Sequence, residues 1–340
     1  MLAVAYHHAG PVTADDALID VELARPTLRP HDLLVKVEAV SVNPVDTKIR
    51  RNSTPGGEAR VLGFDAAGIV AEVGEEVTLF KPGDAVWYAG SNLRPGTDSE
   101  FHAVDERIVG LKPASLDFAE AAALPLTALT AWELLFDRIG VKQGSGAGRR
   151  SLLIVGGAGG VGSIAIQLVR VLTELTVIAT ASRPETIDWV KQLGAHHVIN
   201  HSQPLQPQLA NLGLPAVDIV TAFAGTQAHA AAIADIVAPE GHVGLIEGAT
   251  GITNAELGKF FQNCVTLHFE LMFMRPRLDG GTMIRQHEIL TAVTALVDHG
   301  KIRTTLTKRL SPVSAATLRE AHAIVESGRA IGKVVVEGWP

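Results

Sequence analysis

Cysteine is almost absent from this 340-residue chain, which contains a single one, Cys264. Intramolecular disulfides and cysteine-rich zinc modules are therefore impossible. The residues around Cys264 include the apolar Phe260, Phe261, Val265 and Leu267. These neighbours predict that the thiol is buried as a small apolar side chain and is not a nucleophile.

Long hydrophobic runs and basic blocks are also lacking. Charge, glycine or proline interrupts every apolar stretch before the roughly 18 residues that a membrane-spanning helix needs. The first residues resemble a strand and lack the basic residues, apolar run and cleavage site of a secretory signal. A net charge of −7, without a block of Lys or Arg, argues against a nucleic-acid surface. We expect a cytoplasmic protein that binds neither membrane nor nucleic acid.

The residues that are present indicate a globular protein with more than one domain. Its length exceeds what one hydrophobic core usually serves, and 47% of the residues are hydrophobic. In the first third, strands are predicted at residues 33–42, 68–77, 85–88 and 101–111. Short strands at this spacing are typical of a small, partly open barrel.

Beyond Arg150 the pattern changes to strands that alternate with helices. Apolar strands are predicted at residues 152–155, 176–181, 197–199, 217–221, 243–246 and 265–269. This alternation is typical of a doubly wound parallel sheet covered on both faces. Residues 127–139 predict a helix before this region. The last part predicts helices around residues 289–297 and 315–326 and a strand at 333–336, which we expect to pack back on the barrel.

A glycine-rich turn lies between the first of these strands and the following helix. Gly156, Gly159 and Gly162 are spaced three apart. Glycine lets the backbone turn sharply and approach a pyrophosphate, and the helix N-terminus offers N–H groups to it. The residues predicted to bind the dinucleotide here are Gly156, Gly157, Ala158, Gly159, Gly160, Val161 and Gly162.

The end of the next strand indicates which dinucleotide binds. An NAD site uses an acidic residue there, which accepts a hydrogen bond from the ribose 2′-OH. This chain has Ala181-Ser182-Arg183 instead. Ser182 and Arg183 can both donate to a 2′-phosphate, so NADPH is the predicted cofactor. The alternative is that Arg183 is a solvated residue at the start of a helix.

Five segments, in this order, resemble the medium-chain dehydrogenase/reductase superfamily and its quinone-oxidoreductase-like branch, often labelled zinc-type alcohol dehydrogenase-like. They are residues 43–46 (NPVD), 63–70 (GFDAAGIV), 121–127 (AAALPLT), the glycine-rich turn and 332–336 (GKVVV). The resemblance implies a Rossmann domain and a GroES-like β-barrel catalytic domain. The expected boundaries are 1–126 and 273–340 for the catalytic domain and 127–272 for the Rossmann domain.

The same resemblance shows where this chain departs from zinc-dependent members. Where those enzymes place Cys, His and Cys around the catalytic metal, this chain has Asn43, Phe64 and Leu126. Phenyl and isobutyl groups cannot bind zinc. The four-cysteine structural zinc lobe is also missing. We therefore expect no metal in this protein.

The resemblance further implies residues around the nicotinamide and the 2′-phosphate. Asn43 and Asp46 are expected beside the nicotinamide, where Asn43 can bond a substrate oxygen and Asp46 either takes part in catalysis or orients its loop. Lys48 can stabilise a developing enolate, although a solvated surface lysine is the alternative. Thr130 is expected on the nicotinamide side, with a helix-interior threonine as the alternative, and His201 near the 2′-phosphate.

These observations predict an NADPH-dependent oxidoreductase that reduces quinones or α,β-unsaturated carbonyls without zinc. The acceptor's own conjugation spreads the incoming charge, so a Lewis acid is not needed. Two alternatives are an NADPH-binding structural or regulatory protein with little turnover and a zinc-type alcohol dehydrogenase. Because residues 265–269 form a candidate edge strand, we also expect a homodimer.

Overall fold

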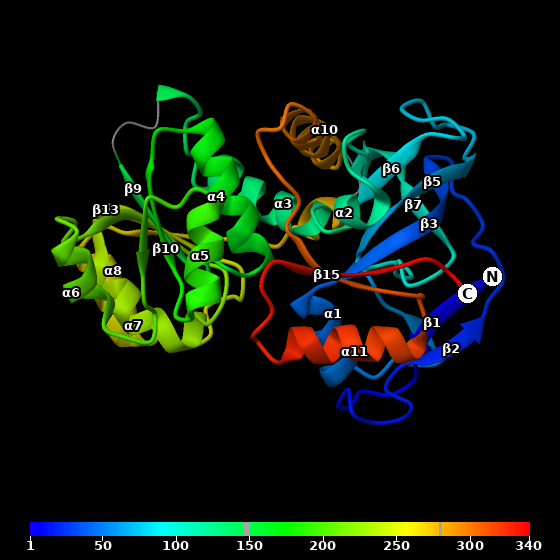
Figure 1. Cartoon of the computed structure of the whole chain (residues 1–340), viewed down its shortest axis with the longest axis horizontal. Helices are drawn as coiled ribbons and strands as arrows, with labels where there is room; N and C mark the ends of the chain where they lie inside the picture. Colours follow the sequence, from blue (N-terminus) through cyan, green and yellow to red (C-terminus); the bar gives the residue numbers. More distant parts are fainter. Residues whose placement is uncertain (146–149, 279–280) are drawn as a thin grey trace. The chain divides into compact units, whose positions relative to one another are not determined.

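The computed structural model describes residues 1–145, 150–278 and 281–340. It contains two compact units, one formed by Met1–Leu129 with Met272–Pro340 and the other by Thr130–Leu271. Both termini belong to the first unit, so the two ends of the chain fold together into one body (Figure 1).

The first unit is mainly antiparallel β-structure. Its strands are β1 (Leu2–Tyr6), β2 (Ile19–Glu22), β3 (Asp32–Val42), β4 (Arg60–Val61), β5 (Asp65–Val73), β6 (Ala85–Tyr88), β7 (Phe101–Asp105), β8 (Val109–Leu111), β15 (Leu306–Leu310) and β16 (Lys333–Glu337). One sheet has the order β15-β16-β3-β5-β6-β8, with β7 also paired to β3, and a smaller sheet has the order β2-β1-β4. Through β16, which pairs antiparallel with β3, the C-terminal segment joins the N-terminal strands.

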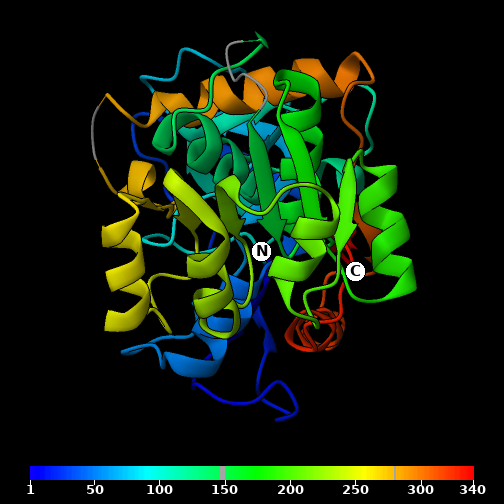
Figure 2. The same ribbon diagram turned by 90° about the vertical axis from the view of Figure 1, so that its left-hand side faces the viewer.

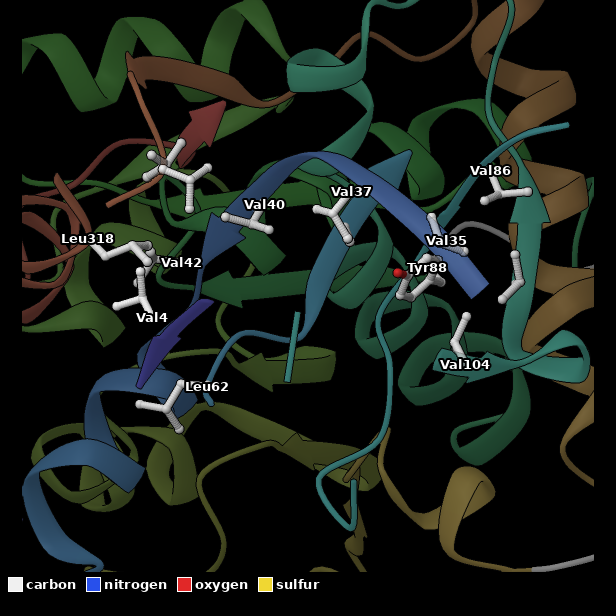
Figure 3. Close-up of a cluster of buried hydrophobic side chains, with 14 of the residues drawn as sticks. Val4, Val35, Val37, Val40, Val42, Leu62, Val86, Tyr88, Val104 and Leu318 are labelled. Atoms are coloured by element: carbon white, nitrogen blue, oxygen red, sulfur yellow. The ribbon is translucent and has the colours of Figure 1, made fainter. Parts of the chain in front are cut away.

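Helices close the ends of this sheet. They are α1 (Pro44–Asn52), the 3₁₀ turn η1 (Glu106–Ile108), α2 (Phe118–Ala122), α9 (Met274–Arg277), α10 (Ile284–Asp298) and α11 (Ala315–Glu326). The core between sheet and helices consists of branched aliphatic side chains such as Val35, Val40 and Leu318, with Tyr88 among them (Figure 3). Branched side chains favour strands and fill this interior densely.

The second unit is a parallel sheet between two layers of helices. Its strands are β9 (Ser151–Val155), β10 (Thr176–Thr180), β11 (His197–Ile199), β12 (Val217–Ala222), β13 (Val237–Leu245) and β14 (Thr266–Phe269). The helices are α4 (Gly160–Leu172), α5 (Pro184–Gln192), α6 (Leu205–Asn211), α7 (Thr226–Ile236) and α8 (Asn254–Gln262). The strand order β11-β10-β9-β12-β13-β14 is that of a Rossmann fold. Helices α4 and α5 lie on one side of the sheet and α7 and α8 on the other (Figure 1 and Figure 2).

One helical stretch corrects the sequence analysis. α3 (Pro125–Trp132) continues into the π-helix η2 (Glu133–Arg138), so the predicted helix at 127–139 begins earlier and changes geometry. With α2, the stretch Phe118–Arg138 is long and apolar enough to cross a membrane, contrary to our expectation. Its most apolar window is 89% buried in the fold, which is the condition of a core helix.

The predicted fold class, a Rossmann sheet plus a GroES-like domain, is confirmed. Three predicted strands differ in detail: 68–77 is β5 at Asp65–Val73, 243–246 is the end of the longer β13 at Val237–Leu245, and 101–111 is broken by η1. Glu106 explains the break, because its buried carboxylate accepts hydrogen bonds from the N–H groups of Thr78 and Leu79. The prediction that Cys264 is buried was wrong: it is exposed and has a positive φ of 52° in the turn after α8.

Candidate functional site

The glycine-rich turn leaves β9 and enters α4 as predicted. Gly156 has a φ of +82°, which favours glycine, and Gly159 is the residue before the first turn of α4. A Cβ on Gly162 would lie 2.3 Å from the carbonyl oxygen of Gly156, so this glycine is required for the helix to pack on the turn. Ala158 is buried, and Gly160 and Val161 are half-buried at the start of α4.

The space above the turn is open at one position. A Cβ on Gly159 would meet only the carbonyl oxygen of Gly156, at 3.5 Å. The N–H groups of the first turn of α4 have no acceptor within the helix, and a helix N-terminus attracts anions. The turn therefore fits the pyrophosphate of a dinucleotide.

The end of β10 is tied to this turn. The Thr180 hydroxyl accepts a hydrogen bond from the N–H of Gly156 at 3.0 Å and lies 3.3 Å from His201 Nδ1. Burial lowers the pKa of His201, and His229 and Arg183 lower it further. Arg183 is half-buried and its Nε lies 3.3 Å from a carboxylate oxygen of Glu185. Ser182 is also half-buried. Ser182 and Arg183 follow β10 directly, and His201 contacts Thr180 at the end of that strand, so the three residues lie around the end of β10.

A buried polar cluster in the first unit holds Asn43. The Asn43 side-chain amide donates to Asp65 Oδ2 at 2.8 Å, and its oxygen accepts from the Lys333 ammonium. Lys333 also bonds Asp65 Oδ2, at 3.0 Å. Asp65 Oδ1 accepts from the backbone N–H of Leu126 at 2.7 Å. This cluster of Asn43, Asp65 and Lys333 therefore fixes the Asn43 amide from both ends.

Asp46 lies next to this cluster on the first turn of α1. Its Oδ2 accepts the backbone N–H of Asn43 at 2.7 Å, while its Oδ1 is buried and has no hydrogen-bond partner among the residues that the structure describes. Burial raises the pKa of Asp46 to about 7, against the lowering effects of the Asn43 N–H and Lys333. The pKa of nearby Asp98 is raised by burial and by Asp46. Asp46 is therefore a buried carboxyl group whose charge changes near neutral pH.

The remaining predicted residues lie in different surroundings. Lys48 is exposed on α1, and Thr130 is buried in α3 with 6% exposure. Sequence reasoning missed Asp65 and Lys333 as members of a site, although both belong to the motifs GFDAAGIV and GKVVV. A charged residue inside an apolar strand pattern was the signal that was available.

Two of the three positions at which zinc-dependent members have metal ligands carry apolar side chains here. Phe64 is 2% exposed and its ring packs on that of Phe273 with centroids 4.6 Å apart. Leu126 is 8% exposed. With the Asn43 amide bound to Asp65 and Lys333, this set of side chains does not fit a catalytic zinc ion.

Three histidines that could otherwise bind zinc, His102, His268 and His287, have other partners. His102 contacts the Tyr88 hydroxyl and the Pro95 carbonyl, while His287 contacts the Val109 carbonyl. His268 belongs to the second unit, where it contacts His242 at 3.1 Å. Within the described ranges, no group of three or more His, Cys, Asp or Glu side chains is arranged to hold a metal ion.

The second unit contains a further buried charged group that the sequence analysis missed. Arg138 at the end of η2 lies between Glu133 and Glu270, at 3.6 and 2.9 Å. Burial raises the pKa of Glu270 to about 8, and the carboxylate of Glu133 raises it as well. The single arginine thus stabilises two buried carboxyl groups at a helix of unusual geometry.

Comparisons with known proteins agree with this geometry. Residues 29–129 match the alcohol dehydrogenase GroES-like domain, and residues 193–336 match the zinc-binding dehydrogenase family. A "zinc-type alcohol dehydrogenase-like protein" of Staphylococcus epidermidis is 40% identical over 307 residues, 90% of either chain. The 2-methylene-furan-3-one reductase of Solanum lycopersicum is 30% identical over 349 residues, covering 100% of this chain and 80% of the reductase.

Solved structures share the whole fold. A crystal structure from Rhizobium etli CFN 42, provisionally described as a zinc-dependent alcohol dehydrogenase, has 56% identity and a TM-score of 0.95 over 100% of this chain and 98% of that one. The quinone oxidoreductase of Coxiella burnetii has 27% identity and a TM-score of 0.81 over 100% of this chain and 99% of that one.

A Rossmann unit with a glycine-rich turn, joined to a GroES-like unit, defines a class of nicotinamide-dependent oxidoreductases. The chain belongs to the medium-chain dehydrogenase/reductase superfamily.

Proposed function

We propose that this protein is a zinc-independent, NADPH-dependent reductase of quinones or α,β-unsaturated carbonyls. The observation that carries the proposal is that apolar side chains stand where zinc-dependent members have metal ligands: Phe64 packs on Phe273, and Leu126 is buried. Without a Lewis acid, the acceptor itself must spread the charge that develops on reduction. Conjugated carbonyls and quinones do so, whereas simple ketones do not.

The chemistry required of the chain is then mainly alignment. When bound, the reduced nicotinamide supplies a hydride to the acceptor. The chain fixes the cofactor at the glycine-rich turn and holds the acceptor close to it, which lowers the entropic part of the barrier. The names of the tomato reductase and the Coxiella quinone oxidoreductase support these two acceptor classes.

Residues of the first unit are proposed to assist this step in distinct ways. The two N–H groups of the Asn43 amide donate to Asp65 and to the Ser41 carbonyl, and its oxygen accepts from Lys333, so Asn43 presents at most its remaining oxygen lone pair to a substrate. Asp46, with a pKa raised to about 7, is the nearby group able to exchange a proton at neutral pH. Lys48 is proposed to stabilise a developing enolate from α1. The homodimer and the cytoplasmic location stay predictions.

The preference for NADPH is tested by Arg183→Ala. Arg183 and Ser182 lie at the end of β10, where a 2′-phosphate is expected. Loss of one hydrogen bond to a charged group costs roughly 1.5–3 kcal/mol, so NADPH binding should weaken about 10- to 100-fold. NADH binding should be nearly unchanged. Calorimetric titration of both cofactors measures this, with Lys191→Ala as a matched loss of charge on the same helix.

The contrary outcome is clear. An equal loss of affinity for NADPH and NADH would mean that Arg183 does not contact the 2′-phosphate. The Glu185 carboxylate, which lies 3.3 Å from Arg183, would then be its main partner.

Zinc independence is tested by metal analysis together with turnover. We expect less than stoichiometric zinc in the purified protein, and NADPH oxidation with quinones and enones that survives chelation. Saturated ketones of the same size serve as control acceptors and should react far more slowly. One zinc per chain, with activity lost on chelation and restored by zinc, would overturn the proposal. Cofactor binding without turnover of any acceptor would instead favour a structural or regulatory protein.

A further inference from the structure

The first unit contains a cavity of about 360 Å³ whose wall is rich in arginine. Arg94 follows β6, Arg107 lies in η1, and Arg29 and Arg277 are exposed at its edge. All of its lining residues belong to the first unit, and none belongs to the glycine-rich turn or to the cluster of Asn43, Asp65 and Lys333. Its volume lies in the range of pockets that bind small molecules.

Two of these arginines are fixed in place by carboxylates. Arg94 donates two hydrogen bonds to the buried Asp32, at 2.7 and 2.6 Å. Arg107 donates two to Asp105, at 2.8 and 2.6 Å. Bidentate pairs hold the planar guanidinium groups in one orientation, so little rotamer entropy remains to be lost when a ligand binds.

The other two arginines leave the cavity positively charged. Arg277 donates to the Asn92 side-chain oxygen at 3.1 Å, which is a neutral partner. The guanidinium of Arg29 makes neither a hydrogen bond nor an ion pair with any described residue. Asp32 and Asp105 offset two of the four positive charges and the other two remain. This concentration of positive charge is notable in a chain with a net charge of −7.

The inner wall is apolar and does not titrate near neutral pH. The buried Val104, Ile108 and Met283 line it, while Leu93 is an exposed lining residue. His102, which also lines it, is bonded through both ring nitrogens, and burial lowers its pKa to about 4. The cavity thus joins an apolar interior to a cationic edge, and its charge does not depend on His102.

We propose that this cavity binds a small organic anion, an apolar body that carries a carboxylate or a phosphate group. Guanidinium groups match the planar oxygens of a carboxylate and the oxygens of a phosphate, and both head groups pair with them in bidentate fashion. The apolar body fills the interior beside Ile108 and Met283, while the head group lies at Arg29 and Arg277.

The test is calorimetric titration of the full chain at low salt with benzoate, phenyl phosphate and the neutral benzamide. One benzoate or phenyl phosphate should bind per chain, and the tighter of the two identifies the head group. The double variant Arg29→Gln/Arg277→Gln should weaken this binding by about tenfold or more, because each contact to a charged group is lost. Benzamide should bind at least about tenfold more weakly than the anions.

Two control variants separate this site from other sources of binding. Arg25→Gln/Arg285→Gln removes the same charge from two positions outside the cavity and should leave the affinity unchanged. Arg183→Ala should also leave it unchanged. The proposal is overturned if neither anion saturates, if benzamide binds equally well, or if the cavity variant binds like the wild type. A loss with either control variant as large as with the cavity variant overturns it as well.

Discussion

Gly159→Val is expected to abolish dinucleotide binding while the protein stays folded. Gly159 precedes α4 with a φ of −74°, which a branched residue adopts without strain. A Cβ there meets only the Gly156 carbonyl, at 3.5 Å, so the chain itself has room for it. The valine side chain would occupy the space in which the pyrophosphate approaches the N–H groups of the turn.

The expected loss is large because several contacts disappear together. Each hydrogen bond to a charged phosphate contributes about 1.5–3 kcal/mol. The loss of two such bonds should therefore weaken NADPH binding by at least about 100-fold. Fluorescence titration of NADPH measures the affinity, and thermal unfolding checks the fold.

Gly162→Ala is the informative comparison for this variant. Its Cβ would lie 2.3 Å from the Gly156 carbonyl oxygen, a contact within the chain, so this variant should lose stability even without cofactor. If Gly159→Val binds NADPH as the wild type does, the turn is not the pyrophosphate site. If Gly159→Val loses stability as Gly162→Ala does, the glycine at position 159 is needed for packing of the turn and not for cofactor binding.

The turn could be predicted because its requirements are local. Gly156, Gly159 and Gly162 are read from neighbouring positions, and strand, turn and helix follow directly along the chain. The alternating apolar strands of the second unit are local patterns too, and each predicted strand has its counterpart in β9 to β14. Local backbone geometry and burial thus make these elements visible in a single sequence.

The buried polar cluster could not be predicted because it joins distant segments. Asp65 and Lys333 are separated by 268 positions and meet only because β16 pairs with β3 beside β5. No periodicity records such a pairing. The prediction that Cys264 is buried failed for a related reason. Its neighbour Phe260 is buried at 4% exposure, whereas Phe261 is 84% exposed. Apolar composition alone does not say which side of a turn faces the core.

Asp46→Asn is expected to remove part of the pH dependence of the free energy of unfolding. Burial raises the pKa of Asp46 from 3.8 to about 7 in the folded chain. The folded state therefore holds this proton more tightly than the unfolded state. The stability that it contributes is fully present below pH 4 and is lost as the pH rises through 7. A shift of about three pKa units corresponds to about 4 kcal/mol, which is an upper limit.

The amide that this substitution introduces would be neutral at every pH, and its oxygen can still accept the Asn43 N–H. The free energy of unfolding of Asp46→Asn, relative to the wild type, should therefore rise by up to about 4 kcal/mol between pH 4 and pH 8. Urea unfolding at a series of pH values measures this difference.

Asp84→Asn is the matched control of opposite sign. Burial by itself raises the pKa of Asp84, but the hydrogen bonds and the charge of Lys81 outweigh burial and lower this pKa. Its stability relative to the wild type should fall as the pH rises. A difference between Asp46→Asn and the wild type that does not change with pH would mean that Asp46 is already ionised in the folded protein, and its proposed part in proton exchange near neutral pH would fail with it.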